Sequence, residues 1–147
     1  MASSVEISLN VVKCLGAFYI IYYCVGSLAF GAYSLQHFDG KIPFDFNTWV
    51  DYMECCKGYT SSELVNLISL MLTYFVLPFV LVTFIRHALW DYILTVTTIH
   101  VAVSSLVMLE FPLNWNWWAS LGIASLFCIC IGESLLLSIN AKSLYLT

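Results

Sequence analysis

Charged residues are scarce in this chain of 147 residues, because only 10% of them are Asp, Glu, Lys or Arg. An ordinary soluble domain carries about 25%. The five Lys and Arg residues are also too few for the basic surface that nucleic-acid binding requires. Hydrophobic residues make up 61% of the chain, and a protein this small cannot bury so much apolar surface in water. The composition therefore predicts an integral membrane protein with no nucleic-acid partner.

Sequence signatures of catalysis and of metal binding are also missing. The six cysteines form no Cys-x-x-Cys pair and combine with no histidine at zinc spacing. The chain contains no glycine-rich phosphate loop, no HExxH, no nucleophile–base signature and no paired catalytic carboxylates. We therefore expect no catalytic residue, no metal and no cofactor, and we expect that the protein is not an enzyme.

Four apolar stretches are long enough to cross a bilayer, and they predict an all-α, four-helix transmembrane bundle. The clearest runs from Tyr92 to Leu109 between two tryptophan-bearing ends, and as a helix it would be about 27 Å long, close to the thickness of the hydrocarbon core. The predicted spans lie near residues 14–35, 64–85, 91–110 and 117–139. Because the chain has one domain's length and no internal repeat, we predict a single four-span membrane domain over residues 1–147.

The first span has an alternative interpretation as a cleaved signal peptide. Its charge-free run over residues 14–35 is longer than the apolar core of a signal peptide, and the preceding residues are not basic. Ser27-Leu28-Ala29 offers only a weak cleavage site. We therefore expect a retained transmembrane span.

The connections between the spans predict the topology. Residues 36–63 form an acidic, aromatic-rich loop that we expect to lie against the lipid headgroups, with a short helix over residues 47–53. Thr60 and Glu63 fit a capping box that starts the second span. The connection over residues 86–89 is so short that it predicts second and third spans that are antiparallel neighbours.

The distribution of lysine and arginine predicts the orientation in the membrane. Four spans place both termini on one side, which would hold Lys13, Arg86 and Lys142, against Lys41 and Lys57 on the other. The excess of basic residues marks the cytosolic side. We therefore predict cytosolic termini, in the plasma membrane or an endomembrane, with the acidic loop facing the lumen or the outside.

Four polar residues are candidate intramembrane sites. His100 lies at the middle of the third span and shares a helix face with Thr97 and Ser104. An imidazole at this depth faces protein or water. One interpretation is a packing contact with a neighbouring helix, and the other is a pore-lining or proton-relay group. Glu133 interrupts the fourth span, where antiparallel pairing would set it level with Thr95, facing the bundle or a partner.

Residues at the span ends are candidate membrane anchors. Asp91 is expected to cap the third helix or to pair with Arg86. Glu110 is expected to be a boundary charge at the other end of that helix. Aromatic residues at both ends suggest interfacial belts. The anchor residues are Trp90, Asp91, Arg86, Trp115, Trp117 and Trp118.

Small residues on the fourth span predict close helix packing. Gly122, Ser125 and Gly132 form a ridge that would serve packing inside the bundle, or an oligomer interface if it faced lipid. The adjacent Cys55 and Cys56 leave open a link to another chain, free thiols or acylated thiols.

Several segments resemble the vertebrate transmembrane protein 244 family. They are Ile42-Pro43-Phe44-Asp45-Phe46, Trp90-Asp91-Tyr92, Ile99-His100-Val101-Ala102, Val107-Met108-Leu109-Glu110-Phe111-Pro112 and Trp117-Trp118-Ala119-Ser120-Leu121-Gly122-Ile123. The resemblance covers most of the chain and diverges at both termini and around residues 52–62. It implies a small multi-pass membrane protein and transfers no catalytic residue.

These observations favour a non-enzymatic membrane module, either a structural or accessory subunit or a self-assembling one. Its partners would be the lipid bilayer and either further copies of itself or another membrane protein. The alternative is an oligomeric channel or pore lined by the polar residues of spans three and four. An intramembrane enzyme has no motif in its support.

Overall fold

The computed structural model describes residues 3–54 and 56–145 and consists of four helices joined by irregular connections. The helices are α1 (Ser4–Ala32), α2 (Ser61–Leu81), α3 (Leu89–Met108) and α4 (Trp115–Tyr145). Each is long and apolar enough to cross a membrane, and the described residues contain no strand. The predicted all-α architecture with four membrane-spanning helices is confirmed.

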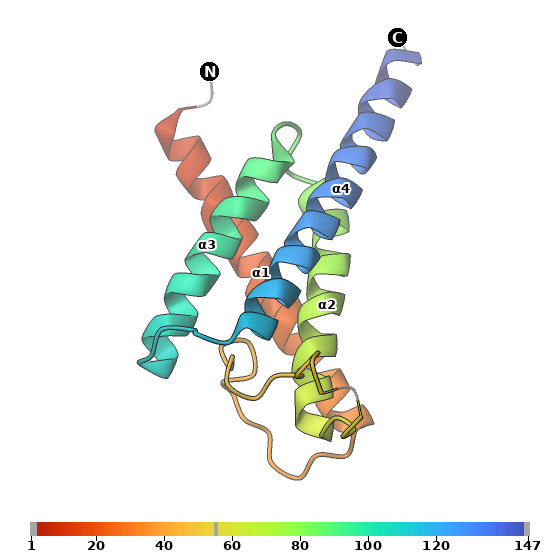
Figure 1. Cartoon of the computed structure of the whole chain (residues 1–147). Helices are drawn as coiled ribbons and strands as arrows, with labels where there is room; N and C mark the ends of the chain where they lie inside the picture. Colours follow the sequence, from red (N-terminus) through yellow and green to blue (C-terminus); the bar gives the residue numbers. More distant parts are fainter. Residues whose placement is uncertain (1–2, 55, 146–147) are drawn as a thin grey trace.

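The helices form a bundle in which α1 packs against α2 and α3, and α4 packs against the same two helices. Both chain ends lie at one end of the bundle together with the α2–α3 connection (Figure 1). The long α1–α2 connection, residues 33–60, and the α3–α4 connection, residues 109–114, lie at the other end. Antiparallel α2 and α3 are therefore diagonal partners, and the expectation that they would be neighbours is wrong. Residues 82–88 are enough chain to cross the end of the bundle.

The helix bounds differ from the predicted spans mainly at the termini of the chain. α1 begins at Ser4, where the side chain of Ser3 accepts a hydrogen bond from the Glu6 amide and caps the helix. α4 continues to Tyr145, past the predicted end at residue 139. Both helices therefore extend beyond the apolar segments that a hydropathy pattern detects.

The second span starts as the sequence predicts. The Thr60 side chain accepts from the Glu63 amide at 3.4 Å, and the Glu63 carboxylate accepts from the Thr60 amide at 2.9 Å. This reciprocal pair is the predicted capping box. α2 ends earlier than expected, at Leu81, three residues after Pro78, which supplies no backbone donor to the helix.

The α1–α2 connection packs into the end of the bundle. Ile42, Phe46, Trp49 and Val50 are buried, and the first three belong to the same core as the helices. Gly26 leaves room for this on α1, because a Cβ there would lie 3.4 Å from the Ile42 side chain. The predicted helix over residues 47–53 is absent from the described part of this segment. The connection is a non-helical part of the fold rather than a loop resting only on headgroups.

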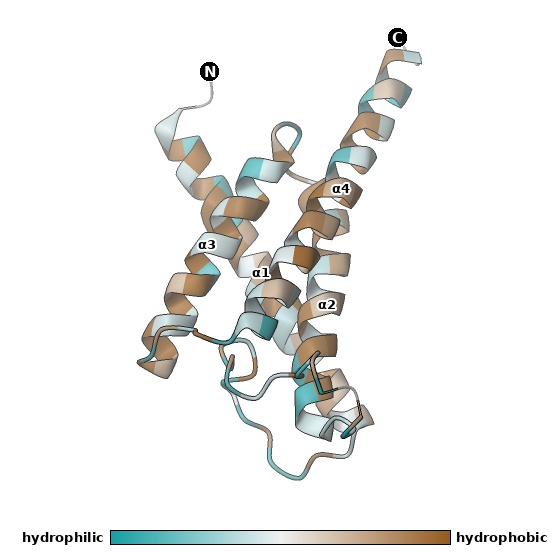
Figure 2. Cartoon of the chain, viewed as in Figure 1, coloured by the Kyte–Doolittle hydropathy of each residue, from teal (hydrophilic) through white to brown (hydrophobic). Residues whose placement is uncertain are grey.

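The outer surface of the bundle is apolar along the helices. Figure 2 shows hydrophobic residues along all four helices and hydrophilic residues gathered in the connections and near the helix ends. Large exposed side chains include Leu28, Leu106, Leu126 and Phe127. Such a surface is stable in hydrocarbon and not in water, which agrees with the chain's composition.

Candidate functional site

The site centres on His100, which α3 turns into the bundle. The buried residues of α3 recur at three- and four-residue intervals, as Leu89, Ile93, Val96, His100 and Ser104. This spacing places them on one face of a helix. His100 has no exposed surface, so its imidazole is enclosed by protein and not by lipid.

Five aromatic side chains from three segments surround the His100 ring, and we call them the aromatic enclosure. Ring centroids lie 5.0 to 6.5 Å from that of the imidazole, within or close to the range of aromatic contacts. The enclosure consists of Phe18, Tyr19 and Tyr22 of α1, Phe44 of the α1–α2 connection and Trp117 of α4. The His100 ring thus contacts α1, the α1–α2 connection and α4.

Polar contacts to the imidazole are few. The Tyr19 hydroxyl lies 3.3 Å from His100 Nδ1, at hydrogen-bonding distance. His100 Nε2 and Ser104 Oγ, one turn further along α3, are buried and have no hydrogen-bond partner among residues 3–54 and 56–145. A buried polar atom left unsatisfied costs about 1–3 kcal/mol. The packing of the aromatic enclosure therefore offsets the free-energy cost of burying these unsatisfied polar atoms at the centre of the bundle.

Thr97 joins α3 to the diagonal helix α2. Its Oγ1 donates to the Ile93 carbonyl at 2.8 Å and lies 2.9 Å from the Tyr74 hydroxyl. Tyr74 in turn stacks edge-on against Phe18 of the aromatic enclosure. His100 and Ser104 are buried on the inner face of α3, whereas Thr97 is half-buried and bonds to α2.

Glu133 lies apart from this core. Its Oε1 accepts a hydrogen bond from the Trp90 amide at 3.0 Å, in the first turn of α3. The residue that precedes α3, Ala88, has a left-handed backbone conformation and no side-chain cap. The Glu133 carboxylate therefore replaces a missing N-cap and interacts favourably with the positive end of the helix dipole.

The predicted level of Glu133 with Thr95 is wrong by more than a helical turn. Trp117 near the start of α4 contacts His100, not the end of α3. Trp118 Nε1 donates to the Pro112 carbonyl, so the α3–α4 connection packs against the first turn of α4. The contact between Trp117 and His100 means that α4 is shifted along its axis, so that each of its residues lies nearer the start of α3 than predicted.

Side-chain hydrogen bonds tie the α1–α2 connection to the helices. Trp49 Nε1 donates to Ser120 Oγ at 2.9 Å inside the bundle, and the Tyr52 hydroxyl lies 2.7 Å from the same oxygen. On the other flank, Asn66 Nδ2 donates to the Thr48 carbonyl at 2.9 Å. The sequence interpretation missed Ser120, because a serine among apolar residues gives no signal of a partner in a distant loop.

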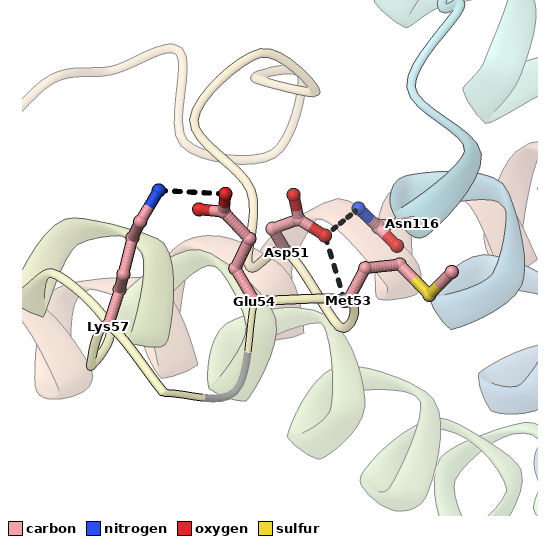
Figure 3. Close-up of polar contacts among 5 residues, drawn as sticks. All are labelled: Asp51, Met53, Glu54, Lys57 and Asn116. Carbon is pink, nitrogen blue, oxygen red and sulfur yellow. Dashed lines mark hydrogen bonds and ion pairs between the residues drawn. The ribbon is translucent and has the colours of Figure 1, made fainter.

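Outer contacts extend this attachment to the surface. Asp51 Oδ1 accepts from the Met53 amide and from Asn116 Nδ2 of α4, while Lys57 pairs with Glu54 at 2.8 Å (Figure 3). Glu110 is exposed and lies within 3.5 Å of Asn47. Phe44 can contact His100 because these bonds hold the connection in place.

The predicted anchor residues have unequal environments. Trp115 is 76% exposed and Trp118 is 37% exposed, whereas Trp117 is 1% exposed and belongs to the aromatic enclosure. Trp117 is therefore a core residue and not an anchor. Trp90 is exposed, as an anchor would be.

Asp91 lies in the first turn of α3, where a negative charge is favourable. Neither predicted role of Asp91 is seen among the described residues: the N-cap position is Ala88, with no side-chain cap, and the ion pair that forms joins Lys57 to Glu54 rather than Asp91 to Arg86. Arg86 is exposed.

The small residues of α4 also separate into two groups. A Cβ on Gly132 would overlap the Leu89 side chain and lie 3.5 Å from Pro78 Cβ, so this glycine lets α4 fit between α2 and α3. Ser125 is buried and bonds to the Gly122 carbonyl. Gly122 itself is exposed and has open space beside it.

Cysteines and acidic residues do not gather into a metal site. Within residues 3–54 and 56–145, no three His, Cys, Asp or Glu side chains come close enough to hold a metal ion. Cys56 is a free, exposed thiol. Cys55 lies outside the described residues, so its redox state stays open.

Comparisons with known proteins give two matches. A family model described as "SYS1: Integral membrane protein S linking to the trans Golgi network" matches residues 4–146. The chain is also 37% identical over 113 residues to "Putative transmembrane protein 244" of Homo sapiens, an alignment that covers 77% of this chain and 84% of that protein. No solved structure matches.

Proposed function

The chain belongs to the SYS1 family of integral membrane proteins, and from this premise we propose that it is a non-enzymatic membrane module of the trans Golgi network. The family description names that compartment. In this role the bundle is an accessory subunit, which other membrane proteins or further copies of the chain recognise through its helix faces and the α1–α2 connection. With both termini in the cytosol, the connection faces the lumen.

The observation that carries this proposal is the structural use of the polar residues within the spans. His100 is enclosed by aromatic rings, Thr97 bonds to α2 and to its own helix, and Glu133 caps α3. Each holds two elements together, which is the role of a packing group in a membrane bundle. A pore lined by these residues would require the enclosure to open, because His100 and Ser104 are both fully buried.

A tagged full-length chain, expressed in cells, tests the location. We expect it to coincide with a trans Golgi marker and to remain in the membrane after alkaline carbonate washing. Steady-state residence in another compartment would contradict the Golgi assignment. Release by carbonate would contradict membrane integration itself.

Purification of the chain from native membranes with its bound partners tests the accessory role. We expect a constant stoichiometry with a second membrane protein or with further copies of the chain, and no current when the purified protein is placed in planar bilayers. Isolated monomers would count against the module. A current that changes in both His100→Ala and Glu133→Gln would favour the channel.

A further inference from the structure

A cavity of about 360 Å³ opens between the end of α1, the α1–α2 connection and the first turns of α2. Its volume lies within the range of small-molecule sites. Its lining combines apolar residues, which include Phe30, Ile42 and Val65, with polar ones, which include Asp39, Asp45 and Asn66. The cavity therefore combines apolar side chains with two carboxylates, which suits an amphiphilic ligand.

The charge of this cavity is unbalanced. Its titratable lining residues are Asp39, Asp45 and His37, and no lysine or arginine lines it. The ion pair of the described residues joins Lys57 to Glu54, so neither aspartate is paired with a cation of the chain. Asp39 is exposed and Asp45 is half-buried, so the lining carries net negative charge and favours a cation.

The two carboxylates differ in how far the fold already uses them. Asp45 Oδ1 accepts from the amides of Asn47 and Thr48, and Oδ2 is reached by Asn66 at 3.4 Å. Asp39 Oδ1 accepts from the Lys41 amide, while its Oδ2 has no hydrogen bond with the described residues. Asp39 is therefore the carboxylate with capacity for an outside donor, and Asp45 shapes the cavity.

We propose that this cavity binds an alkylammonium group, with Asp39 Oδ2 accepting from the ammonium, the charge of Asp45 adding to the attraction, and the apolar residues of the lining contacting the carbon stem. α1 ends at Ala32 and α2 begins at Ser61, so the cavity lies at the ends of two spans, where lipid headgroups are found. An ethanolamine headgroup of a phospholipid has this chemistry, and so does a free small amine. The proposal is independent of the module's Golgi location.

The test uses the purified full-length chain in nanodiscs of phosphatidylglycerol, which has no amine, with phosphatidylethanolamine added in steps. Native mass spectrometry reports which lipid stays bound. We expect the wild type to retain phosphatidylethanolamine selectively, and Asp39→Asn to lower that selectivity about tenfold, because a charge-assisted hydrogen bond is lost. The matched control is Glu54→Gln, which removes the same charge from the same connection outside the cavity lining, and which should retain the lipid as the wild type does.

A second variant guards against a folding defect in Asp39→Asn. Ser62 is an exposed lining residue, whereas its exposed neighbour Ser61 does not line the cavity. Ser62→Lys would supply a cation of the chain's own and should displace the lipid, while Ser61→Lys should not.

Free ethanolamine, added to nanodiscs of phosphatidylglycerol alone, separates the two sources. If free ethanolamine protects the wild type against thermal unfolding but does not protect Asp39→Asn, a soluble amine is sufficient. If only the lipid is retained, the ligand is the headgroup. Equal retention of both lipids with no effect of ethanolamine would overturn the proposal. So would selectivity that survives both Asp39→Asn and Ser62→Lys.

Discussion

His100 shows how one polar residue can hold a membrane bundle together. Its ring contacts the aromatic enclosure formed by α1, the α1–α2 connection and α4, and its Nδ1 lies within hydrogen-bonding distance of Tyr19. A leucine at this position would fill similar space without the hydrogen bond. Burying Nε2 without a hydrogen bond costs free energy. The directional contact between Nδ1 and Tyr19, which positions α1, offsets this cost.

Replacing His100 by alanine should destabilise the protein by about 2–4 kcal/mol, because it leaves a cavity inside the enclosure. His100→Phe should lose less, since it keeps the aromatic volume and removes the unsatisfied Nε2. Thermal unfolding in detergent measures both. The control is Thr98→Ala on the exposed side of α3, where the hydroxyl bonds only to the Leu94 carbonyl. A proton-relay role for His100 predicts a different pattern, in which both variants abolish the current in planar bilayers to the same extent and neither lowers the stability.

Glu133 is a residue whose role depends on the helix opposite. Glu133→Ala should cost about 1 kcal/mol, because the Trp90 amide and the positive end of α3 lose their acceptor. Hydrogen exchange in the first turn of α3 should rise, and Glu133→Gln should recover most of the protection, since an amide oxygen can still accept. Glu110→Ala, at the other end of α3, is the control. Unchanged exchange at Trp90 in Glu133→Ala would refute the cap.

At the level of the helices, α4 depends on a close approach at Gly132. Gly132→Val should destabilise the bundle by several kcal/mol, because the added side chain meets Leu89 of α3 and Pro78 of α2. Gly122→Val is the matched control on the same helix, since nothing lies within 4 Å of a Cβ there. Thermal unfolding should separate the two variants clearly.

The same pair also reports on self-association. Gly122 is exposed, so a valine at this position should leave the monomer intact and should weaken oligomers only if this face of α4 joins two copies. Cross-linking in membranes would detect that loss. In the stability test, equal destabilisation by Gly132→Val and Gly122→Val would mean that α4 does not pack against α2 and α3 through Gly132.

The elements themselves were predictable from local sequence, whereas their lateral packing was not. Hydropathy located four helices, and the Thr60–Glu63 capping box fixed the start of α2, because both signals are local. The burial of Trp117 and the level of Glu133 depend on how the α3–α4 connection packs, which no residue pattern encodes. For the same reason the sequence predicts residues 36–63 as a loop against the headgroups, although Phe46 and Trp49 complete the core.

For the whole molecule, the central claim is that the four helices cross the membrane as one bundle and that both termini lie on the same side of it. The contacts of His100, Ser120 and Glu133 require that the helices alternate in direction and that the α1–α2 connection closes the opposite end. The orientation of that bundle, with cytosolic termini, is a further prediction from the lysine and arginine counts.

Protease protection of sealed membrane vesicles carrying the full chain, with a different epitope tag at each end, tests this claim most directly. We predict that both tags are digested together from the cytosolic face, while the exposed thiol of Cys56 reacts with an impermeant reagent only from the opposite face. Tags on opposite faces of the membrane, or Cys56 accessible from the same face as the tags, would contradict the four-span bundle.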